Sequence, residues 1–169
     1  MNIINIGDVI IYGRHGICKV TGLKDMCMDE LMRPYYVLKP VYHTTATVYV
    51  SAISGKSKTE IRNLLSTDEI FSLFKKMSGK NFSWNNDNRK RKELYSQILA
   101  DGNHSELIKM IKTLHCHKQE LKVKNKNNKL QISDEDFLKD AEKTLCEEFA
   151  YVLNINREDV IPLIYEQSF

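Results

Sequence analysis

No stretch of the sequence stays apolar over the roughly 20 residues that a membrane-spanning helix needs. The N-terminal segment also lacks a basic region followed by an apolar core, which is the pattern of a secretory signal. With 28% charged and 42% hydrophobic residues, the chain of 169 residues has the composition of a globular protein that buries its own core. We therefore expect a cytoplasmic protein that does not interact with a membrane.

Cysteine is scarce, and no pair of cysteines stands in a C-x-x-C spacing. The sequence therefore predicts neither a disulfide framework nor a structural zinc site. The run His115-Cys116-His117 contains metal-binding residue types, but consecutive residues of a helix point about 100° apart and cannot converge on one ion. We interpret the cysteines as small apolar residues and expect no metal and no cofactor. The four are Cys18, Cys27, Cys116 and Cys146.

The common catalytic motifs are absent as well. There is no glycine-rich phosphate loop, no G-x-S-x-G and no H-E-x-x-H. Asp134, Asp136 and Asp140 could line one side of a helix and bind a divalent ion, as in a metal-dependent hydrolase. Their place at a predicted helix N-terminus is explained more simply by capping and by compensation of the helix dipole. The sequence therefore predicts a protein that is not an enzyme.

Charge is distributed unevenly along the chain. Residues 55–132 hold 17 Lys and Arg against 8 Asp and Glu, a net charge of +9, whereas residues 133–169 hold 3 against 10, a net charge of −7. The overall charge of +3 hides this contrast. A polyanion would feel the central basic region over about 8–10 Å at physiological salt. This favours a nucleic acid as a partner.

The first 54 residues have the composition of β-strands. Residues 6–12 and 17–23 are rich in β-branched side chains and flank Gly13-Arg14-His15-Gly16, a typical tight-turn sequence, which predicts a hairpin. Further strands are predicted at 35–39 and 47–50, with a hairpin loop at 25–34. Regularly spaced short strands are typical of a small barrel.

After Ser54 the apolar period changes from two towards 3.6, which predicts helices. Ser66 and Glu69 form a capping-box pattern, and Asn103 has the same spacing to Glu106. We expect a compact helical bundle joined to the β-structure by a linker, hence an α+β protein of two domains with boundaries at 1–54, 55–66 and 67–169. The predicted helices start near Ser66, Asp87, Asn103, Ser133 and Asn156.

Trp84 is the only tryptophan, and four consecutive cations follow it closely, at Arg89-Lys90-Arg91-Lys92. A large planar ring beside a basic run is what a wedge into nucleic acid requires, because cations hold phosphates while the ring inserts at a base step. The same pattern fits a buried tryptophan next to a solvated helix face. The residues alone leave both interpretations open.

Several segments, in order along the chain, resemble the CarD/CdnL family of bacterial transcription regulators. They are Ile6 to Ile17, Tyr36-Val37-Leu38-Lys39, Thr47-Val48-Tyr49-Val50, and Trp84 with its basic helix. The first segment is also similar to the polymerase-interacting domain of transcription-repair coupling factor. The resemblance implies a Tudor-like N-terminal barrel that binds the β subunit of RNA polymerase, followed by an all-α domain that contacts promoter DNA.

The resemblance also implies functional residues. A barrel edge strand extends a sheet of the polymerase by strand addition, and the matching residues are Thr47, Val48, Tyr49 and Val50. Trp84 would wedge into the minor groove at the upstream edge of the transcription bubble, where the base step is already disturbed. Phosphate contacts are expected from Arg89, Lys90, Arg91 and Lys92, and from charge alone also from Lys124 and Lys126.

The function that follows is a monomeric regulator that binds RNA polymerase and stabilises the open promoter complex without reading sequence. The alternative is a nucleic-acid-binding protein that acts without polymerase and binds free duplex with a steep salt dependence.

Overall fold

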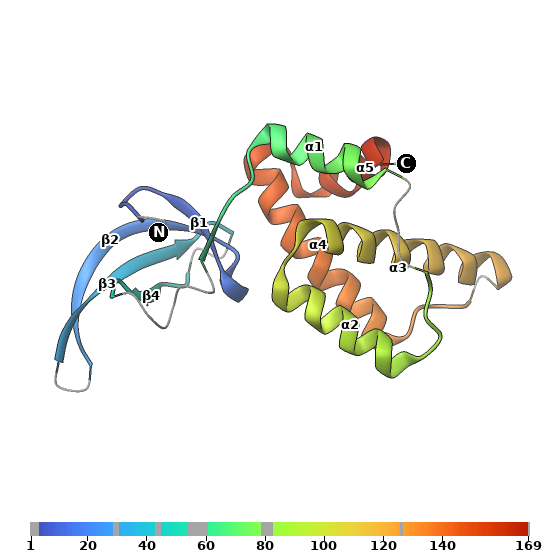
Figure 1. Ribbon diagram of the computed structural model, residues 1–169, viewed down its shortest axis with the longest axis horizontal. Coiled ribbons are helices and arrows are strands. Elements are labelled where there is room, and N and C mark those ends of the chain that lie inside the picture. Colours follow the sequence, from blue (N-terminus) through green and yellow to red (C-terminus); the bar gives the residue numbers. More distant parts are fainter. Residues whose placement is uncertain are drawn as a thin grey trace. The chain divides into compact units, whose positions relative to one another are not determined.

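The computed structural model describes residues 4–28, 31–42, 45–53, 61–78, 83–125 and 127–168. The chain divides into two compact units, Met1–Leu65 and Ser66–Phe169. The described part of the first unit is an antiparallel sheet, and that of the second consists of helices, so the predicted α+β class is confirmed (Figure 1). No helix within these ranges combines the length and the apolar character that crossing a membrane requires.

The first unit is built on a five-stranded antiparallel sheet with the order β4-β3-β2-β1-β5. The predicted hairpin is confirmed, because β1 pairs with β2 around a short 3-10 turn at Gly13–His15. Gly13 and Gly16 have φ angles of 42° and 67°, which a residue without a Cβ adopts without strain. The strands are β1 Val9–Tyr12, β2 Ile17–Met28, β3 Leu31–Pro40, β4 Val48–Ser51 and β5 Ile61–Asn63.

One face of this sheet carries the core of the unit. The buried residues come from four strands, so burial of this apolar face fixes the register of the sheet. Partly buried Tyr36 and Val48 pack against them. The core residues are Ile10, Cys18, Val20, Leu38 and Val50.

Three expectations for the first unit need correction. The strands seen in the described residues form an open sheet rather than a closed barrel. Residues 25–28 and 31–34 of the predicted loop are strand: Asp25 pairs with Pro34 and Met28 with Leu31, so β2 and β3 extend as a ribbon. The polar residues and the proline of this stretch are typical of a turn. A two-stranded ribbon, however, exposes both of its faces, so its sequence need not alternate apolar and polar residues. The linker predicted at residues 55–66 contains strand β5. This strand is too short for its sequence to show the alternation of apolar and polar residues that predicts a strand.

The second unit contains five helices in its described residues. The capping box of Ser66 and Glu69 is confirmed, with Ser66 N–H donating to Glu69 Oε2 at 2.7 Å. Asp87 and Asn103 cap the next two helices as predicted, and Gly102 ends α2 in the left-handed conformation with φ 60°. The helices are α1 Thr67–Met77, α2 Asn88–Asp101, α3 His104–Lys124, α4 Ile132–Leu153 and α5 Arg157–Ser168.

The helical unit packs around aromatic and aliphatic side chains that are fully buried. Phe74 of α1 meets Phe149 of α4 edge to face, with ring centroids 5.6 Å apart. Lys112 of α3 is also buried and donates to the Met77 carbonyl at 3.2 Å, and burial lowers its pKa. The predicted apolar stripes therefore form a core.

The predicted cap of α4 is wrong. The helix begins at Ile132, and its N-cap residue Gln131 makes no side-chain capping bond. Asp134, which the sequence placed in the capping turn, is 1% exposed and binds a side chain of another helix instead. A long-range ion pair has replaced the local hydrogen bond that the sequence pattern suggested.

Candidate functional site

Trp84 lies in the segment that leads into α2, and it is neither sealed in the core nor fully exposed. Its ring stacks on the imidazole of His117 from α3, with centroids 3.5 Å apart and planes 14° apart. The residue as a whole is half-buried. Such a ring can meet a ligand on its accessible part while its packed part stays in contact with the protein.

Arg91 is the second neighbour of Trp84, and the structure gives it a different place from the one predicted. Its side chain is 3% exposed, and its guanidinium carbon lies 4.4 Å from the centre of the Trp84 ring, which is a cation–π contact. The guanidinium donates to both carboxylate oxygens of Asp134, at 3.1 and 2.7 Å. A buried guanidinium in a bidentate pair is not available to phosphate, so Arg91 leaves the set of DNA-contacting cations.

The Arg91–Asp134 pair also affects Tyr95, one turn further along α2. Burial and, to a lesser extent, the Asp134 carboxylate raise the pKa of Tyr95 to about 12, although Arg91 acts in the opposite direction. Tyr95 packs edge to face on Phe137 of α4, with centroids 5.7 Å apart. The phenol therefore stays neutral at physiological pH and serves as a packing group behind the ion pair.

The other three cations of the basic run are exposed at the start of α2. The side chain of Arg89 is 89% exposed and pairs with Glu93 at 3.2 Å, and that of Lys90 is 73% exposed and lies 4.0 Å from Asp87. Lys92 is exposed as well. Exposed pairs of this kind contribute only about 0–1 kcal/mol, so the cations can exchange these partners for phosphate.

The position of these exposed cations destabilises helix α2. The first turn of α2 contains no acidic residue, so cations occupy the end where the helix dipole already places positive charge. The Asp87 carboxylate offsets part of this by accepting from the N–H groups of Arg89 and Lys90, at 3.0 and 3.2 Å. A basic first turn is unfavourable for folding, but it suits a surface that attracts anions.

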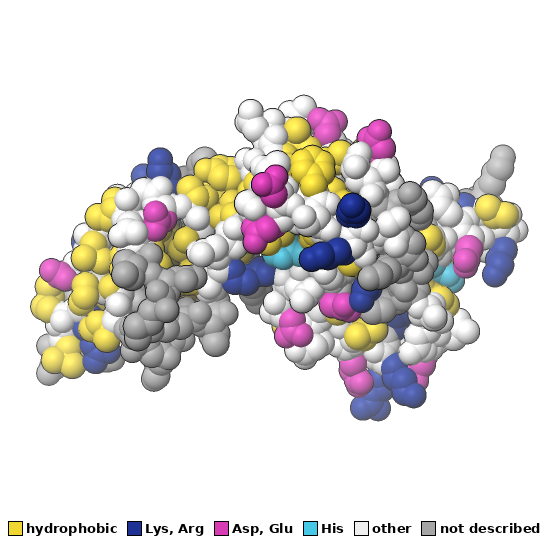
Figure 2. All heavy atoms as spheres, turned by 45° about the horizontal axis from the view of Figure 1, so that its top comes forward, with side chains coloured by type: hydrophobic (Ala, Val, Ile, Leu, Met, Phe, Trp, Pro, Cys, Tyr) yellow, Lys and Arg dark blue, Asp and Glu magenta, His cyan; other side chains and the backbone are white. Residues whose placement is uncertain are grey.

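The N-terminal ends of α2 and α4 and the C-terminal part of α3 gather at one end of the helical unit (Figure 1). Figure 2 shows dark-blue cationic side chains at this end, with magenta carboxylates among them. Lys122 and Lys124 are exposed in the last turn of α3, whereas Lys126 lies outside the described residues. We call Trp84, Arg89, Lys90, Lys92 and Lys124 the basic end.

The first unit offers a different kind of surface. Strand β4 lies at one edge of the sheet, and no strand in the described part of the chain pairs with its outer side. Val50 is buried in the core, Tyr49 is 43% exposed, and Thr47 lies exposed just before the strand. Ala52 N–H bonds to the Pro34 carbonyl at 2.9 Å. Because hydrogen bonding alternates along antiparallel strands, the N–H and C=O of Tyr49 point outward.

A sheet whose edge strand is not covered by another described strand can accept a strand from a partner protein. Comparison with known families assigns it more closely: residues 4–64 match the CarD-like/TRCF RID domain. This domain is an RNA polymerase-interacting domain and not an enzyme class. Residues 4–64 of the first unit are thus similar to this domain family, which confirms the resemblance for the segments within it. A search of curated proteins gave no match to the chain.

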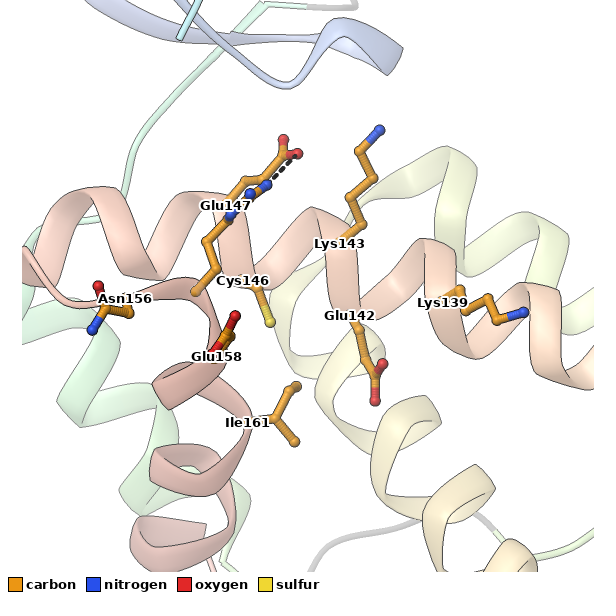
Figure 3. Close-up of a pocket in the computed structure, with 9 residues that line it drawn as sticks. Lys139, Glu142, Lys143, Cys146, Glu147, Asn156, Glu158 and Ile161 are labelled. Carbon is orange, nitrogen blue, oxygen red and sulfur yellow. Dashed lines mark ion pairs between the residues drawn. The ribbon is translucent and has the colours of Figure 1, made fainter. Parts of the chain in front are cut away.

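A pocket of about 680 Å³ lies between α4 and α5, and Figure 3 shows residues that line it. Its charges are mixed: Glu147 pairs with Arg157 at 3.9 Å, and Lys139 and Lys143 lie nearby. Burial raises the pKa of the Cys146 thiol to about 12, so no reactive thiolate is present there at neutral pH. Within the described residues, no three His, Cys, Asp or Glu side chains are grouped to hold a metal ion. The pocket has no catalytic arrangement among the residues that line it.

Sequence reasoning did not identify His117 and Asp134 as the residues that surround Trp84 and Arg91. Both contacts join segments far apart in the chain, and Arg91 and Asp134 are 43 positions apart. One signal was nevertheless present. Arg91, Tyr95 and Ile98 share one face of a helix by their spacing, and the latter two are apolar core residues, which marks Arg91 as the inward-facing member of the basic run.

Proposed function

We propose that this protein is a transcription regulator that binds the β subunit of RNA polymerase and stabilises the open promoter complex. The observation that carries the proposal is the RNA polymerase-interacting domain at residues 4–64, joined in one chain to a helical unit with a partly exposed tryptophan beside exposed cations. In this proposal the first unit binds RNA polymerase, and the helical unit binds DNA. The contacts with DNA are to backbone and base step, without sequence readout.

The free edge of β4 supports the polymerase contact. An edge strand offers unpaired backbone groups to which another sheet can add a strand, and side chains on the strand adjust the fit. Val48 and Val50 face the core and hold the strand in place, while Tyr49 presents its backbone outward. Strand addition to β4 is therefore the contact that we propose, with Thr47, Val48, Tyr49 and Val50 as the interface.

We expect Tyr49→Pro to weaken binding to RNA polymerase by about tenfold, because it removes one outward N–H donor and places a ring against the incoming strand. The sheet itself should tolerate proline at an outward-facing position of an edge strand. Affinity for purified polymerase can be measured by biolayer interferometry.

Tyr49→Thr is the matched control for this change. Threonine retains the N–H donor and a good strand propensity while it removes the phenol. If backbone pairing carries the affinity, Tyr49→Thr binds much more tightly than Tyr49→Pro. Equal affinity of both variants and the wild-type chain would contradict strand addition at β4.

The basic end supports the DNA contact. Trp84 is half-buried, and Arg89, Lys90 and Lys92 are exposed near the start of α2. At the edge of a transcription bubble the base step is already partly unstacked, so insertion of an indole costs less than it does in intact duplex. An inserted ring then opposes reclosure of the bubble. Lys124 and Lys126 extend the expected phosphate contacts.

Neutralising the three α2 cations tests the phosphate contacts. We expect the variant Arg89→Gln, Lys90→Gln, Lys92→Gln to bind forked DNA more weakly than the wild-type chain does. The slope of log affinity against log salt should fall by about 0.9 for each phosphate that the variant no longer neutralises, because fewer counterions are then released on binding. Fluorescence anisotropy at several salt concentrations measures both quantities.

The control for this variant removes three cations from another surface of the same unit, by Lys139→Gln, Lys143→Gln and Arg157→Gln. The change of net charge is identical, so only the position of the charge differs. If both triple variants reduce the slope equally, binding depends on net charge alone and the basic end is not the DNA surface.

The second candidate is a nucleic-acid-binding protein that works without polymerase, which the net charge of +9 over residues 55–132 favours. The two functions differ in one observable. A polymerase-bound regulator copurifies with RNA polymerase after nuclease treatment, and the alternative does not. Tight binding to free duplex together with a failure to copurify would establish the alternative.

A further inference from the structure

The basic end contains a contact that its proposed use does not by itself require. Arg91 is buried beneath the Trp84 ring, and its Nη1 donates to the carbonyl of Asn85, the residue after Trp84, at 2.7 Å. The same guanidinium is held by both oxygens of Asp134 on α4. One side chain thus contacts the indole, the backbone beside it and a second helix.

This geometry restricts the orientation of the guanidinium. The plane of an arginine fork is fixed when two of its nitrogens bind one carboxylate, because both hydrogen bonds must stay in line. Asp134 is 1% exposed and sits on a helix, so it gives this plane a rigid reference. The Asn85 bond then fixes the backbone next to Trp84 to the same group. The Trp84 ring thus lies between this fixed guanidinium and the imidazole of His117, which stacks on it.

We propose that Arg91 is a positioning residue, which Asp134 fixes in place and which sets the orientation of Trp84 so that its exposed part is presented to DNA. This inference rests on the proposed function, and it concerns how the indole is held rather than whether it binds. Lysine at position 91 would retain the charge but would lose the planar fork, and with it the simultaneous contacts to Asp134, Asn85 and the ring. The positive charge of residue 91 is therefore not sufficient to position the indole.

Trp84 is the only tryptophan, so the intrinsic fluorescence of the intact chain reports on this ring directly. We expect Arg91→Lys to shift the emission of Trp84 to longer wavelength and to raise its quenching by acrylamide, with unchanged helical circular dichroism. Asp134→Asn should act in the same direction because it weakens the bidentate pair. Arg157→Lys, the same substitution on α5, is the control and should change neither quantity.

The consequence for function is measured in parallel. We expect Arg91→Lys to shorten the lifetime of the open promoter complex by about threefold or more, the factor given by loss of a typical cation–π contact, while polymerase affinity stays unchanged. Trp84→Ala is measured beside it. If Trp84→Ala shortens the lifetime but a folded Arg91→Lys with a freed indole does not, the positioning inference is overturned and the proposed function stands. If Trp84→Ala has no effect, the wedge is removed from the proposed function, and the fluorescence still decides the positioning.

A measurement on the wild-type chain keeps the inference testable if the variants do not fold. Time-resolved fluorescence anisotropy of Trp84 should decay with the tumbling of the protein and should lack a fast component from local motion of the indole. A large component faster than this tumbling in the free protein would overturn the inference, as would unchanged emission and quenching in folded Arg91→Lys.

Discussion

Trp84→Ala is expected to shorten the lifetime of the open promoter complex at least about fivefold, because the wedge holds open a base step whose unstacking involves about a few kcal/mol. The lifetime is measured as the decay of complexes after a challenge with a competitor. Binding to RNA polymerase should not change, because the substitution lies outside residues 4–64. The loss is thus confined to the step in which the bubble recloses.

Two controls separate this effect from damage to the fold. Trp84→Phe retains a smaller ring and should give an intermediate lifetime. Because Trp84 also stacks on His117, the thermal unfolding of each variant must be recorded by circular dichroism. Equal lifetimes for Trp84→Ala and the wild-type chain would remove the wedge from the mechanism, and gross unfolding of the variant would favour a core role for the ring.

The second large effect concerns stability. Arg91→Ala should lower the free energy of unfolding of the helical unit by about 3–5 kcal/mol, because it leaves the carboxylate of Asp134 buried and unpaired with its cation. The neighbouring Arg89→Ala should cost less than about 1 kcal/mol, since its pair with Glu93 is exposed. Urea unfolding followed by Trp84 fluorescence reports on this unit specifically.

The double substitution Arg91→Met, Asp134→Leu gives a further test. Replacing both members of a buried pair with apolar side chains is often neutral, so this variant should recover much of the stability lost in Arg91→Ala. It would lose the cation beneath Trp84, however, and therefore should not recover the lifetime of the open complex. If Arg91→Ala is no more destabilising than Arg89→Ala, the buried ion pair does not have the role assigned to it.

Local patterns in the sequence were sufficient to predict the helical unit. The caps at Ser66, Asp87 and Asn103 are formed by side chains that bind N–H groups two or three residues away, so the pattern contains the whole interaction. The first hairpin was predictable for the same reason, because Gly13 and Gly16 provide the turn. The start of α4 was not predictable in this way. Asp134, which was expected in the capping turn of this helix, instead accepts hydrogen bonds from Arg91, 43 positions away.

The extended ribbon of β2 and β3 shows a second limit. Asp25 and Pro34 favour a turn when they are considered locally, yet they are cross-strand partners in the structure. The ribbon exposes Leu23, Leu31 and Met32, so no buried face imposed an alternating pattern on it. Strand pairing was decided by the register of the neighbouring sheet, which single-sequence periodicity does not contain.

The candidate site was predictable in composition and not in geometry. The sequence singles out the tryptophan and the basic run as a candidate site, but four adjacent cations look alike until the helix face is known. Burial then separates Arg91, which supports the ring, from Arg89, Lys90 and Lys92, which remain on the surface. One cation of the run thus has a place within the fold, and the other three are the ones that we propose for phosphate contacts.

Because the two proposed contacts are made by one chain, each of them can have a modest affinity. A unit that is bound to polymerase raises the effective concentration of the other unit at the promoter, so weak contact with DNA becomes effective only where polymerase is present. A contact that depends on an already disturbed base step adds selectivity for promoters that have opened. The protein would thus act on the lifetime of a complex rather than on the choice of a sequence.

The most direct test is the lifetime of open complexes formed by the cognate RNA polymerase at one promoter, with and without the wild-type protein. Decay after a competitor challenge is recorded at saturating protein. The account predicts slower decay in the presence of the protein. Identical decay with and without it, under conditions in which the protein is bound to the polymerase, would contradict stabilisation of the open complex.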